Sequence, residues 1–306
     1  MKAAVIAGSQ QLQIVDAHVP EPGPRQVRVR LEGCGVCASN LPVWEGRPWF
    51  RYPLGAGEPG HEGWGVVDAV GDDVDVALGE RVAFLSNRAY AELDLAAAGA
   101  FVVIPPSLER FPGEAFGCAM NIFARSDIEA GQTVAIVGAG FLGNALVQLC
   151  KAAGAHVIAI SRRESAREIA RACGADETLP MGGDAIGRVH AERVIECTGK
   201  QEGLDAATNI VTERGRLVIA GYHQDGLRQV DMQKWNWLGI DVVNAHERDA
   251  RQYVAGMWAA VSAITSGRLK PELLLTHTYA LDELGLALND VRERPDGFVK
   301  GMVVFG

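Results

Sequence analysis

Residues 133–143 read Thr133-Val-Ala-Ile-Val-Gly-Ala-Gly-Phe-Leu-Gly143, an unbroken apolar run followed by a glycine-rich turn. The run predicts a buried strand, and helical periodicity over 141–153 predicts that a helix follows the turn. The same alternation continues through a predicted strand at 156–160 and a predicted helix at 164–173, and further apolar runs lie at 194–197, 217–220 and 240–244. These five runs indicate a doubly wound parallel sheet, for which we expect six strands as in the α/β architecture of a Rossmann domain.

The turn fits a dinucleotide-binding motif because it follows a strand and opens a helix. Gly138 would form the tight turn, Gly140 would let the backbone approach a pyrophosphate, and Gly143 would let the helix pack on the sheet. Phe141 and Leu142 complete the motif at the helix N-terminus, where amide groups and the helix dipole favour phosphate. We therefore expect NAD or NADP to bind here.

The end of the second strand bears on the choice between these two cofactors. NAD binding favours an acidic residue about 20 positions after the glycines, but Ser161, Arg162 and Arg163 stand there. A small hydroxyl and two guanidinium groups could bind a 2′-phosphate through charge-assisted hydrogen bonds, so the sequence favours NADP. If both arginines are only solvated at a helix start, NAD remains the alternative.

The first third of the chain indicates a small β-rich domain. Residues 26–32 alternate strictly, which places Val27, Val29 and Leu31 on one face of a half-buried antiparallel strand. Short apolar runs at 65–70, 81–84 and 100–104 are separated by turn residues. Beyond residue 249 a predicted helix (252–266) and a predicted strand (298–305) show no βαβ pattern, so we expect this tail to return to the first domain. The expected division is 1–118, 119–246 and 247–306.

Length, charge and cysteine content exclude several classes of protein. A chain of 306 residues is long enough for two domains. The net charge of −9 and the lack of a long Lys/Arg cluster argue against nucleic-acid binding. The start has no signal-peptide pattern and no stretch is apolar enough to span a membrane. Six scattered cysteines do not form a disulfide scaffold, so we expect a cytoplasmic protein.

Two segments carry residues that could hold a metal. Cys37 lies in Gly-Cys-Gly-Val-Cys-Ala-Ser-Asn (33–40) and His61 lies in Gly-Glu-Pro-Gly-His-Glu-Gly (57–63). Cysteine and histidine are favourable zinc ligands, and a catalytic zinc takes three protein ligands while one position stays open. Glu62, next to the histidine, and Glu114, just before the dinucleotide-binding domain, are both candidates for the third ligand.

Together, Gly-x-Gly-x-Cys at 33–37, Gly-His-Glu-Gly at 60–63 and the glycine turn resemble the medium-chain dehydrogenase/reductase superfamily, specifically its zinc-dependent alcohol and polyol dehydrogenases. The resemblance covers essentially the whole chain. It implies a GroES-like catalytic domain built from both termini, a Rossmann domain between them, and a homodimer or homotetramer joined through sheet edges. It also implies one catalytic zinc per chain and a small alcohol or carbonyl substrate.

The resemblance assigns a function to each candidate ligand. Cys37 and His61 match the family's zinc ligands, and Glu114 lies in a segment similar to the one that supplies the third ligand. Cys118 is a rival for that third position. Glu62 matches a glutamate that lies beside the zinc and can exchange as a ligand.

The chain also departs from the family pattern near the expected metal. Ser39 matches the hydroxyl residue that bonds the substrate oxygen and passes its proton onward. Many members carry Asp at the next position, where this chain has Asn40, and His at the position of Pro42. The resemblance therefore implies that a negative charge that usually tunes the metal is missing at Asn40, and that the histidine that completes the usual proton relay is missing at Pro42. The four cysteines of the family's structural zinc lobe have no counterpart between residues 82 and 113.

Three further residues are expected to contact the cofactor. Thr198 and Gly221 lie at the ends of later strands of the predicted parallel sheet, where ligands bind in such folds, and resemble the family's nicotinamide-side loops. Lys300, on the predicted final strand, could reach a cofactor phosphate, or it could be a surface lysine on an edge strand.

Two other functions are compatible with the same scaffold. One is a zinc-free, NADPH-dependent reductase of quinones or enones, which would need neither Cys37 nor His61. The other is a non-catalytic NADP-binding protein, for which Asn40 and Pro42 leave room. The candidate ligands and Ser39 favour hydride transfer between a nicotinamide cofactor and a secondary alcohol, polyol, sugar or aryl alcohol, or the corresponding carbonyl.

Overall fold

The computed structural model describes residues 1–306, which divide into two compact units. Unit 1 contains residues 1–117, 249–261 and 275–306, so it is built from both ends of the chain. Unit 2 contains residues 118–248 and 262–274. Helices α2 (Gly113–Ser126) and α7 (Ala250–Thr265) cross the boundary and contribute residues to both units.

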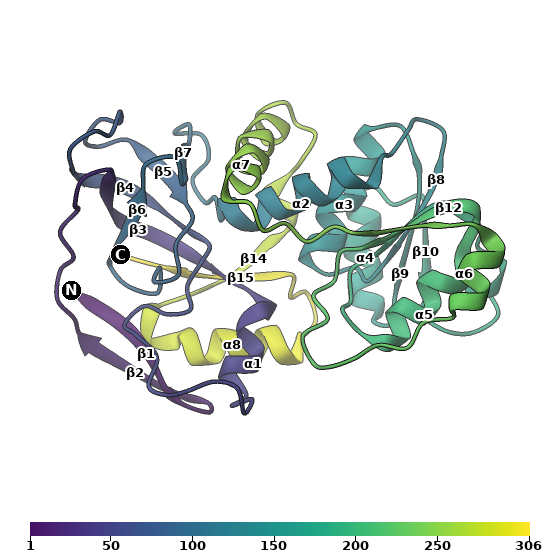
Figure 1. The fold of residues 1–306 in the computed structure, drawn as a ribbon, viewed down its shortest axis with the longest axis horizontal. Coiled ribbons are helices and arrows are strands. Elements are labelled where there is room, and N and C mark those ends of the chain that lie inside the picture. Colours follow the sequence, from purple (N-terminus) through teal and green to yellow (C-terminus); the bar gives the residue numbers. More distant parts are fainter. The chain divides into compact units, whose positions relative to one another are not determined.

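A seven-stranded mixed sheet forms the centre of unit 1. Its strand order is β14-β15-β3-β4-β5-β7, and β6 pairs with β3. Figure 1 shows β15, in yellow, beside β3, in purple, although they lie at opposite ends of the sequence. The bounds are β3 (Gln26–Val36), β4 (Gly63–Val70), β5 (Arg81–Phe84), β6 (Leu93–Ala97), β7 (Phe101–Val103), β14 (Leu275–Tyr279) and β15 (Lys300–Val304).

The core of unit 1 lies on the inward face of this sheet. Val27, Val29 and Leu31 on β3 are buried, as the alternation in the sequence predicts. The same core includes Trp44 on the short helix α1 (Leu41–Trp44) and apolar residues of α8 (Leu284–Glu293). The Trp44 indole N–H donates to Asn289 Oδ1 at 3.0 Å, which ties α1 to α8. A hairpin of β1 (Lys2–Gly8) and β2 (Gln11–Asp16) completes the unit.

Unit 2 contains the doubly wound sheet that the sequence predicts. Its six parallel strands have the order β10-β9-β8-β11-β12-β13, which is the Rossmann order 3-2-1-4-5-6. The strands β8 and β9 are almost wholly buried, as expected for a sheet covered on both faces. The strands are β8 (Thr133–Val137), β9 (His156–Ser161), β10 (Glu177–Pro180), β11 (Ala191–Glu196), β12 (Val211–Ile219) and β13 (Asp241–Asn244).

Four helices connect the strands of unit 2. They are α3 (Phe141–Ala152), α4 (Glu164–Ala172), α5 (Gln201–Ile210) and α6 (Met232–Leu238). The first two begin at the residues that the periodicity predicts. No helix of the protein combines the length and the apolar character needed to cross a bilayer.

The two compact units differ from the expected division chiefly at residues 262–274, which lie in unit 2; residues 118, 247 and 248 also lie there. Gln148 on α3 explains part of this difference: its side chain accepts a hydrogen bond from Lys270 N at 2.7 Å and donates one to Lys270 O at 3.4 Å. Leu269 and Leu274 are also fully buried. These contacts attach the segment to unit 2 without strand pairing, so no βαβ pattern in the sequence could assign it there.

Candidate functional site

Three strand ends of unit 1 meet at one end of its sheet. In the antiparallel pairing of β3 with β4, Cys34 lies opposite Gly63, and in the pairing of β15 with β3, Gly301 lies opposite Val36. The residues just beyond these pairs are Cys37, His61 with Glu62, and Lys300. Strand register therefore brings together three segments that are far apart in the sequence.

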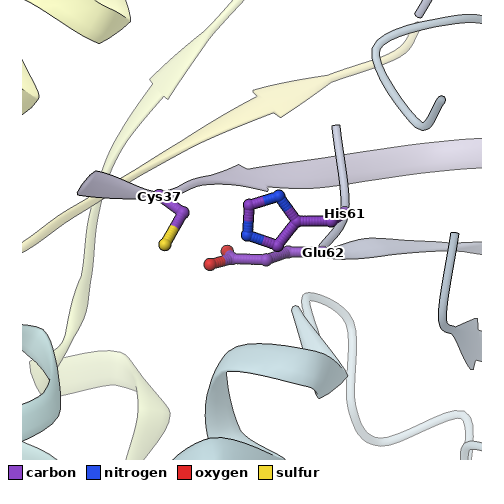
Figure 2. A group of neighbouring side chains, drawn as sticks. All are labelled: Cys37, His61 and Glu62. Atoms are coloured by element: carbon purple, nitrogen blue, oxygen red, sulfur yellow. The ribbon is translucent and has the colours of Figure 1, made fainter. Parts of the chain in front are cut away.

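Cys37, His61 and Glu62 form a potential metal site. One ligand atom from each residue lies within 4.8 Å of the others. Figure 2 shows the sulfur, the imidazole ring and the carboxylate gathered in one place. Glu62 is only 1% exposed, while the other two side chains are partly exposed. All three residues belong to unit 1, so the group does not depend on the placement of unit 2.

The glycines of the Gly-x-Gly-x-Cys motif make room for this group. A Cβ atom at Gly35 would lie 1.8 Å from Glu62 Oε2, and one at Gly33 would lie 2.2 Å from the Trp64 ring. Gly33 and Gly35 alternate along β3 and so share one face of the strand. Any larger residue at position 35 would occupy the space of the Glu62 carboxylate. Sequence reasoning used these glycines only as a family signature and missed their function.

The surroundings of His61 prepare its ring for metal binding. Its Nδ1 lies 2.9 Å from Pro59 O, and because a carbonyl oxygen only accepts, Nδ1 carries the hydrogen. Burial lowers the pKa of His61, but a hydrogen bond to Cys37 and the negative charges of Cys37, Glu114 and Glu62 raise it to about 10. Negative charge that favours a proton also favours a divalent cation, which would displace that proton from Nε2.

Glu62 and Lys300 form a buried ion pair beside this group. The ammonium nitrogen of Lys300 lies 2.6 Å from each carboxylate oxygen. The hydrogen-bond geometry is satisfied only at Oε1, and Oε2 has no hydrogen-bond partner. The surface alternative for Lys300 is wrong, because it is 4% exposed and β15 lies between β14 and β3. Contact of Lys300 with a cofactor phosphate stays a prediction.

The donor set fits a zinc ion. Sulfur, imidazole nitrogen and carboxylate oxygen are the ligand types that zinc accepts at catalytic sites. The unpartnered Glu62 Oε2 is a buried acceptor, and such atoms need an explanation in a native structure. This oxygen lies 2.6 Å from the Lys300 ammonium without accepting a hydrogen bond, so it retains capacity to bind a metal ion at the Cys37–His61–Glu62 group.

The other two candidate ligands lie on α2. Glu114 is in the first turn of that helix in unit 1, and its negative charge acts on both His61 and Lys300. Cys118 lies four residues further along and belongs to unit 2. Whether Glu114 or Cys118 ligates the metal stays a prediction.

Ser39 and Asn40 follow the ligand Cys37 in a single 3-10 turn (Ala38–Asn40). Ser39 Oγ lies 3.4 Å from His61 Nε2, so the hydroxyl is within the group. Asn40 is buried and donates from Nδ2 to the Tyr90 hydroxyl at 2.8 Å, and that hydroxyl donates to Gly35 O at 3.3 Å. The Asn40 amide therefore bonds the Tyr90 phenol, while the His61 ring is oriented by its hydrogen bond to Pro59 O.

In unit 2 the glycine turn has the geometry that its motif predicts. Gly138 has φ +105°, and a Cβ there would lie 2.8 Å from Thr198 Cγ2. A Cβ at Gly143 would lie 1.9 Å from Gly138 O, so the helix can pack this closely only with glycine. Gly140 is the N-cap of α3, with Phe141 and Leu142 in its first turn. The turn and the Thr198 loop therefore meet at the carboxyl ends of β8 and β11.

A second buried carboxylate fixes the two loops that hold Thr198 and Gly221. Glu196, the last residue of β11, accepts hydrogen bonds at Oε1 from the Thr198 amide (2.6 Å), the Thr198 hydroxyl and the Gly199 amide (3.0 Å). Its Oε2 accepts from His223 Nε2 at 3.0 Å. A Cβ at Gly221 would lie 2.7 Å from that oxygen. No motif in the sequence indicated this function of Glu196.

The predicted 2′-phosphate site lies at the end of β9. Ser161 is buried there, and Arg162 forms an exposed ion pair with Glu202 at 3.4 Å. Arg162, Glu202 and Arg188 line a cavity of about 760 Å³ within unit 2. Arg163 is the N-cap residue of α4. The structure thus places two arginines and two carboxylates, Glu202 and Asp184, around a cavity beside β9.

Comparisons with known proteins agree with both units. Residues 23–136 match the alcohol dehydrogenase GroES-like domain, and residues 142–263 match the zinc-binding dehydrogenase domain. The chain is 30% identical to an alcohol dehydrogenase of Geobacillus stearothermophilus over 264 residues, which is 72% of this chain and 77% of that protein. The chain belongs to the zinc-type medium-chain dehydrogenases. Members of this family act on alcohols or polyols, so the dehydrogenase is an oxidoreductase.

Two solved structures show the same fold as this dehydrogenase. RspB of Escherichia coli CFT073, solved with NADH, has a TM-score of 0.87 at 22% identity and covers 100% of this chain and 99% of its own. A Sinorhizobium meliloti protein, solved with NADP, has a TM-score of 0.85 at 24% identity and covers 99% of each chain. Both nicotinamide cofactors therefore occur among the structural neighbours of the dehydrogenase.

Proposed function

We propose that this dehydrogenase holds one zinc ion at Cys37, His61 and a carboxylate, and transfers hydride between an alcohol or carbonyl substrate and a nicotinamide cofactor. The observation that carries the proposal is the convergence of three zinc-type ligand atoms within 4.8 Å beside the Ser39 hydroxyl. Family membership supports the reaction class. The zinc-free reductase is not favoured, since it has no need for this set of ligand atoms.

Each residue of the site has a separate task in this reaction. Zinc, when bound, supplies a Lewis acid for the substrate oxygen. His61 is held by Pro59 O with Nε2 free to ligate, and Ser39 Oγ, at 3.4 Å from Nε2, is placed to exchange a proton with the substrate oxygen. Pro42 is buried at the start of α1, so no imidazole continues the relay there. The proton therefore passes from Ser39 to water or to cofactor hydroxyls.

Metal content tests the proposal directly. Chelator-washed protein is resupplied with zinc, desalted and assayed for metal, next to Cys37→Ala and the control Cys150→Ala, a buried cysteine of unit 2. We expect about one zinc per chain in the wild type and the control, and loss of the metal in Cys37→Ala. If the resupplied wild type holds no zinc, the metal mechanism is wrong and a zinc-free reductase becomes the better assignment.

We further propose that Glu114 supplies the third protein ligand and that Glu62 ligates only in exchange with substrate or water. The partnership of Glu62 with Lys300 supports this, since its carboxylate already has a counter-charge. Zinc affinity of Glu114→Gln should fall by at least tenfold, while Glu62→Gln should change it less. The reverse order would make Glu62 the permanent ligand.

We propose NADP as the preferred cofactor. The support is the absence of an acidic residue at Ser161, Arg162 and Arg163, the positions just after the second strand. Titration of protein fluorescence with NADPH and NADH should give tighter binding of NADPH. The variant Arg162→Gln should weaken the binding of NADPH more than the binding of NADH. Tighter binding of NADH by the wild type would overturn this preference.

We propose a homodimer joined through the free edge of β13. That strand ends the sheet of unit 2, so one row of its backbone groups is available for pairing. Trp237 is 87% exposed, and Met232 and Val242 are also exposed on the same strand and on the helix before it. Two copies could pair their edges around a two-fold axis. Sedimentation should show a dimer that Val242→Lys shifts toward monomer; a wild-type monomer at micromolar concentration would exclude this dimer.

A further inference from the structure

The buried ammonium group of Lys300 is an unusual neighbour for a metal site, because two cations must share one carboxylate. Thr276 on β14 fixes the Lys300 backbone: its hydroxyl lies 3.3 Å from both Lys300 N and Lys300 O. The side chain then reaches Glu62 at 2.6 Å. With both its backbone and its ammonium group held, Lys300 presents a fixed positive charge beside the ligand group.

The Lys300 ammonium lies 2.6 Å from both oxygens of Glu62 but accounts for their hydrogen-bonding capacity unequally. Its Oε1 accepts the hydrogen bond from Lys300, while Oε2 has no hydrogen-bond partner. Gly35 leaves the space that this carboxylate fills, with no room for a side chain of its own. The geometry therefore restrains Glu62 toward Lys300, with Oε2 in charge contact with the ammonium but accepting no hydrogen bond. A carboxylate in this state can approach a metal and withdraw from it again.

Charge also connects Lys300 with metal binding. A site with Cys37 as thiolate and Glu62 and Glu114 as carboxylates carries three negative charges, and Lys300 leaves two, which a divalent ion neutralises. Without Lys300 the buried negative charge would exceed that of the metal, and the attraction for a cation would rise.

We propose that Lys300 is a positioning residue that holds Glu62 back from permanent metal coordination, weakening zinc binding and keeping a coordination position for substrate. This inference rests on the proposed function of the Cys37–His61–Glu62 group. It assigns to Lys300 a function in unit 1 that does not require a cofactor phosphate.

The sharpest test is a double-mutant cycle on zinc affinity, measured by competition with a chromophoric chelator. Lys300→Met should bind zinc at least tenfold more tightly, since it loses a buried positive charge and frees Glu62. Lys300→Arg, which keeps the charge, should stay within about threefold of wild type. In a Glu62→Gln background the effect of Lys300→Met should shrink severalfold. The control Lys151→Met removes a lysine paired with Asp176 in unit 2 and should not change zinc affinity.

Cobalt(II) gives a second readout that a purely structural role would not change. Its visible absorption reports coordination number, so Lys300→Met should show a spectrum distinct from wild type, and Lys300→Arg should restore the wild-type spectrum. Unchanged or weaker zinc binding by Lys300→Met, or an equal effect with and without Glu62, would overturn the inference. A wild type that binds no zinc would instead remove the proposed function itself, so the two failures are distinguishable.

Discussion

Glu62 and Glu196 are both buried carboxylates beside a strand end, one in each unit, but their surroundings differ. Glu196 accepts hydrogen bonds at both oxygens, from two amides and a hydroxyl of its own loop and from His223. Glu62 faces one ammonium group, a thiol and an imidazole, and one of its oxygens has no hydrogen-bond partner. The first carboxylate ties two loops together, and the second is left able to bind something else.

The comparison indicates how a buried carboxylate with a structural role differs from one that can bind a metal. A carboxylate saturated by backbone amides holds its surroundings rigid, because moving it would leave several buried donors without partners. A carboxylate with an unpartnered oxygen among sulfur and nitrogen ligands is suited to a metal. Burial is the same for both residues, so burial alone does not distinguish them; the number and type of hydrogen-bond donors does.

The largest effect should follow from truncating the saturated carboxylate. Glu196→Ala leaves the amides of Thr198 and Gly199 without their acceptor and removes the partner of His223. Each buried unsatisfied donor costs about 1–3 kcal/mol, so we expect the free energy of unfolding to fall by about 4 kcal/mol or more. Urea unfolding, followed separately from zinc content, measures this change.

Glu196→Gln is the matched control, since it keeps one acceptor oxygen and the volume of the side chain. It should lower the free energy of unfolding less than Glu196→Ala does, because Oε1 can still accept hydrogen bonds from the loop. Zinc content should be unchanged in both folded variants. If Glu196→Ala lost less than about 1 kcal/mol, the network would not be what holds these loops.

A smaller effect on stability should follow from Glu62→Gln. The variant leaves the buried Lys300 ammonium with a neutral acceptor in place of its counter-ion, and breaking a buried pair in this way typically costs about 3–5 kcal/mol. The remaining amide oxygen still accepts a hydrogen bond, so we expect about 2–3 kcal/mol in the metal-free protein. The double variant Glu62→Leu/Lys300→Met, which removes both charges, should recover most of the loss. A double variant with a lower free energy of unfolding than Glu62→Gln would contradict this account.

A pH effect is expected at Asp225, which joins the Glu196 network through Arg228: that guanidinium bonds both Asp225 and His223. Hydrogen bonds from Arg228 and Lys200 hold the pKa of Asp225 below its usual range. Because the folded pKa lies below the unfolded value of about 3.9, this carboxylate stabilises the fold above about pH 4, and the contribution is lost as the pH falls further. Asp225→Asn should cost about 1 kcal/mol at pH 7 after solvent screening and flatten the loss of stability below pH 4.

Urea unfolding at a series of pH values between 3 and 7 tests this sign. Asp184→Asn serves as the control, because Asp184 is an exposed carboxylate outside the network. It should leave the pH dependence close to that of the wild type. An Asp225→Asn variant with the same steep acid loss would mean that other carboxylates are responsible.

Local patterns in the sequence predicted the parallel sheet and the group of candidate zinc ligands, but not the side chains that contact those ligands. Alternation along β3 and the apolar run of β8 are local properties, so the sequence contains them directly. The pairing of Glu62 with Lys300 depends on the register of β15 against β3, which brings together residues 238 positions apart. No periodicity contains that register, and the same reason explains why Lys300 was expected at a phosphate or at the surface.

Side-chain networks were the other feature that the sequence could not supply. The link from Glu196 to His223 and Arg228 joins loops whose conformations are set by φ angles and turns rather than by repeats. Asn40 appeared only as a departure from a family pattern, and its partner Tyr90 lies 50 residues away. One local signal was not used. Glycines at positions 33 and 35 lie on the same face of a strand, which indicates that other side chains, here Trp64 and Glu62, pack closely against that face.

The smallest effect should come from an exposed carboxylate, Glu202, which completes the comparison with the two buried ones. Glu202 and Arg162 are 72% and 71% exposed, so their ion pair adds at most about 0.5 kcal/mol to stability. Glu202→Gln should therefore leave unfolding unchanged. The substitution removes a negative charge from the cavity where the 2′-phosphate is expected. Because the repulsion between Glu202 and the phosphate is screened by solvent, we expect the affinity for NADPH to rise about threefold and the affinity for NADH to stay unchanged. Equal gains for both cofactors would mean that Glu202 acts on the shared adenosine; no gain for either would place the 2′-phosphate away from Arg162.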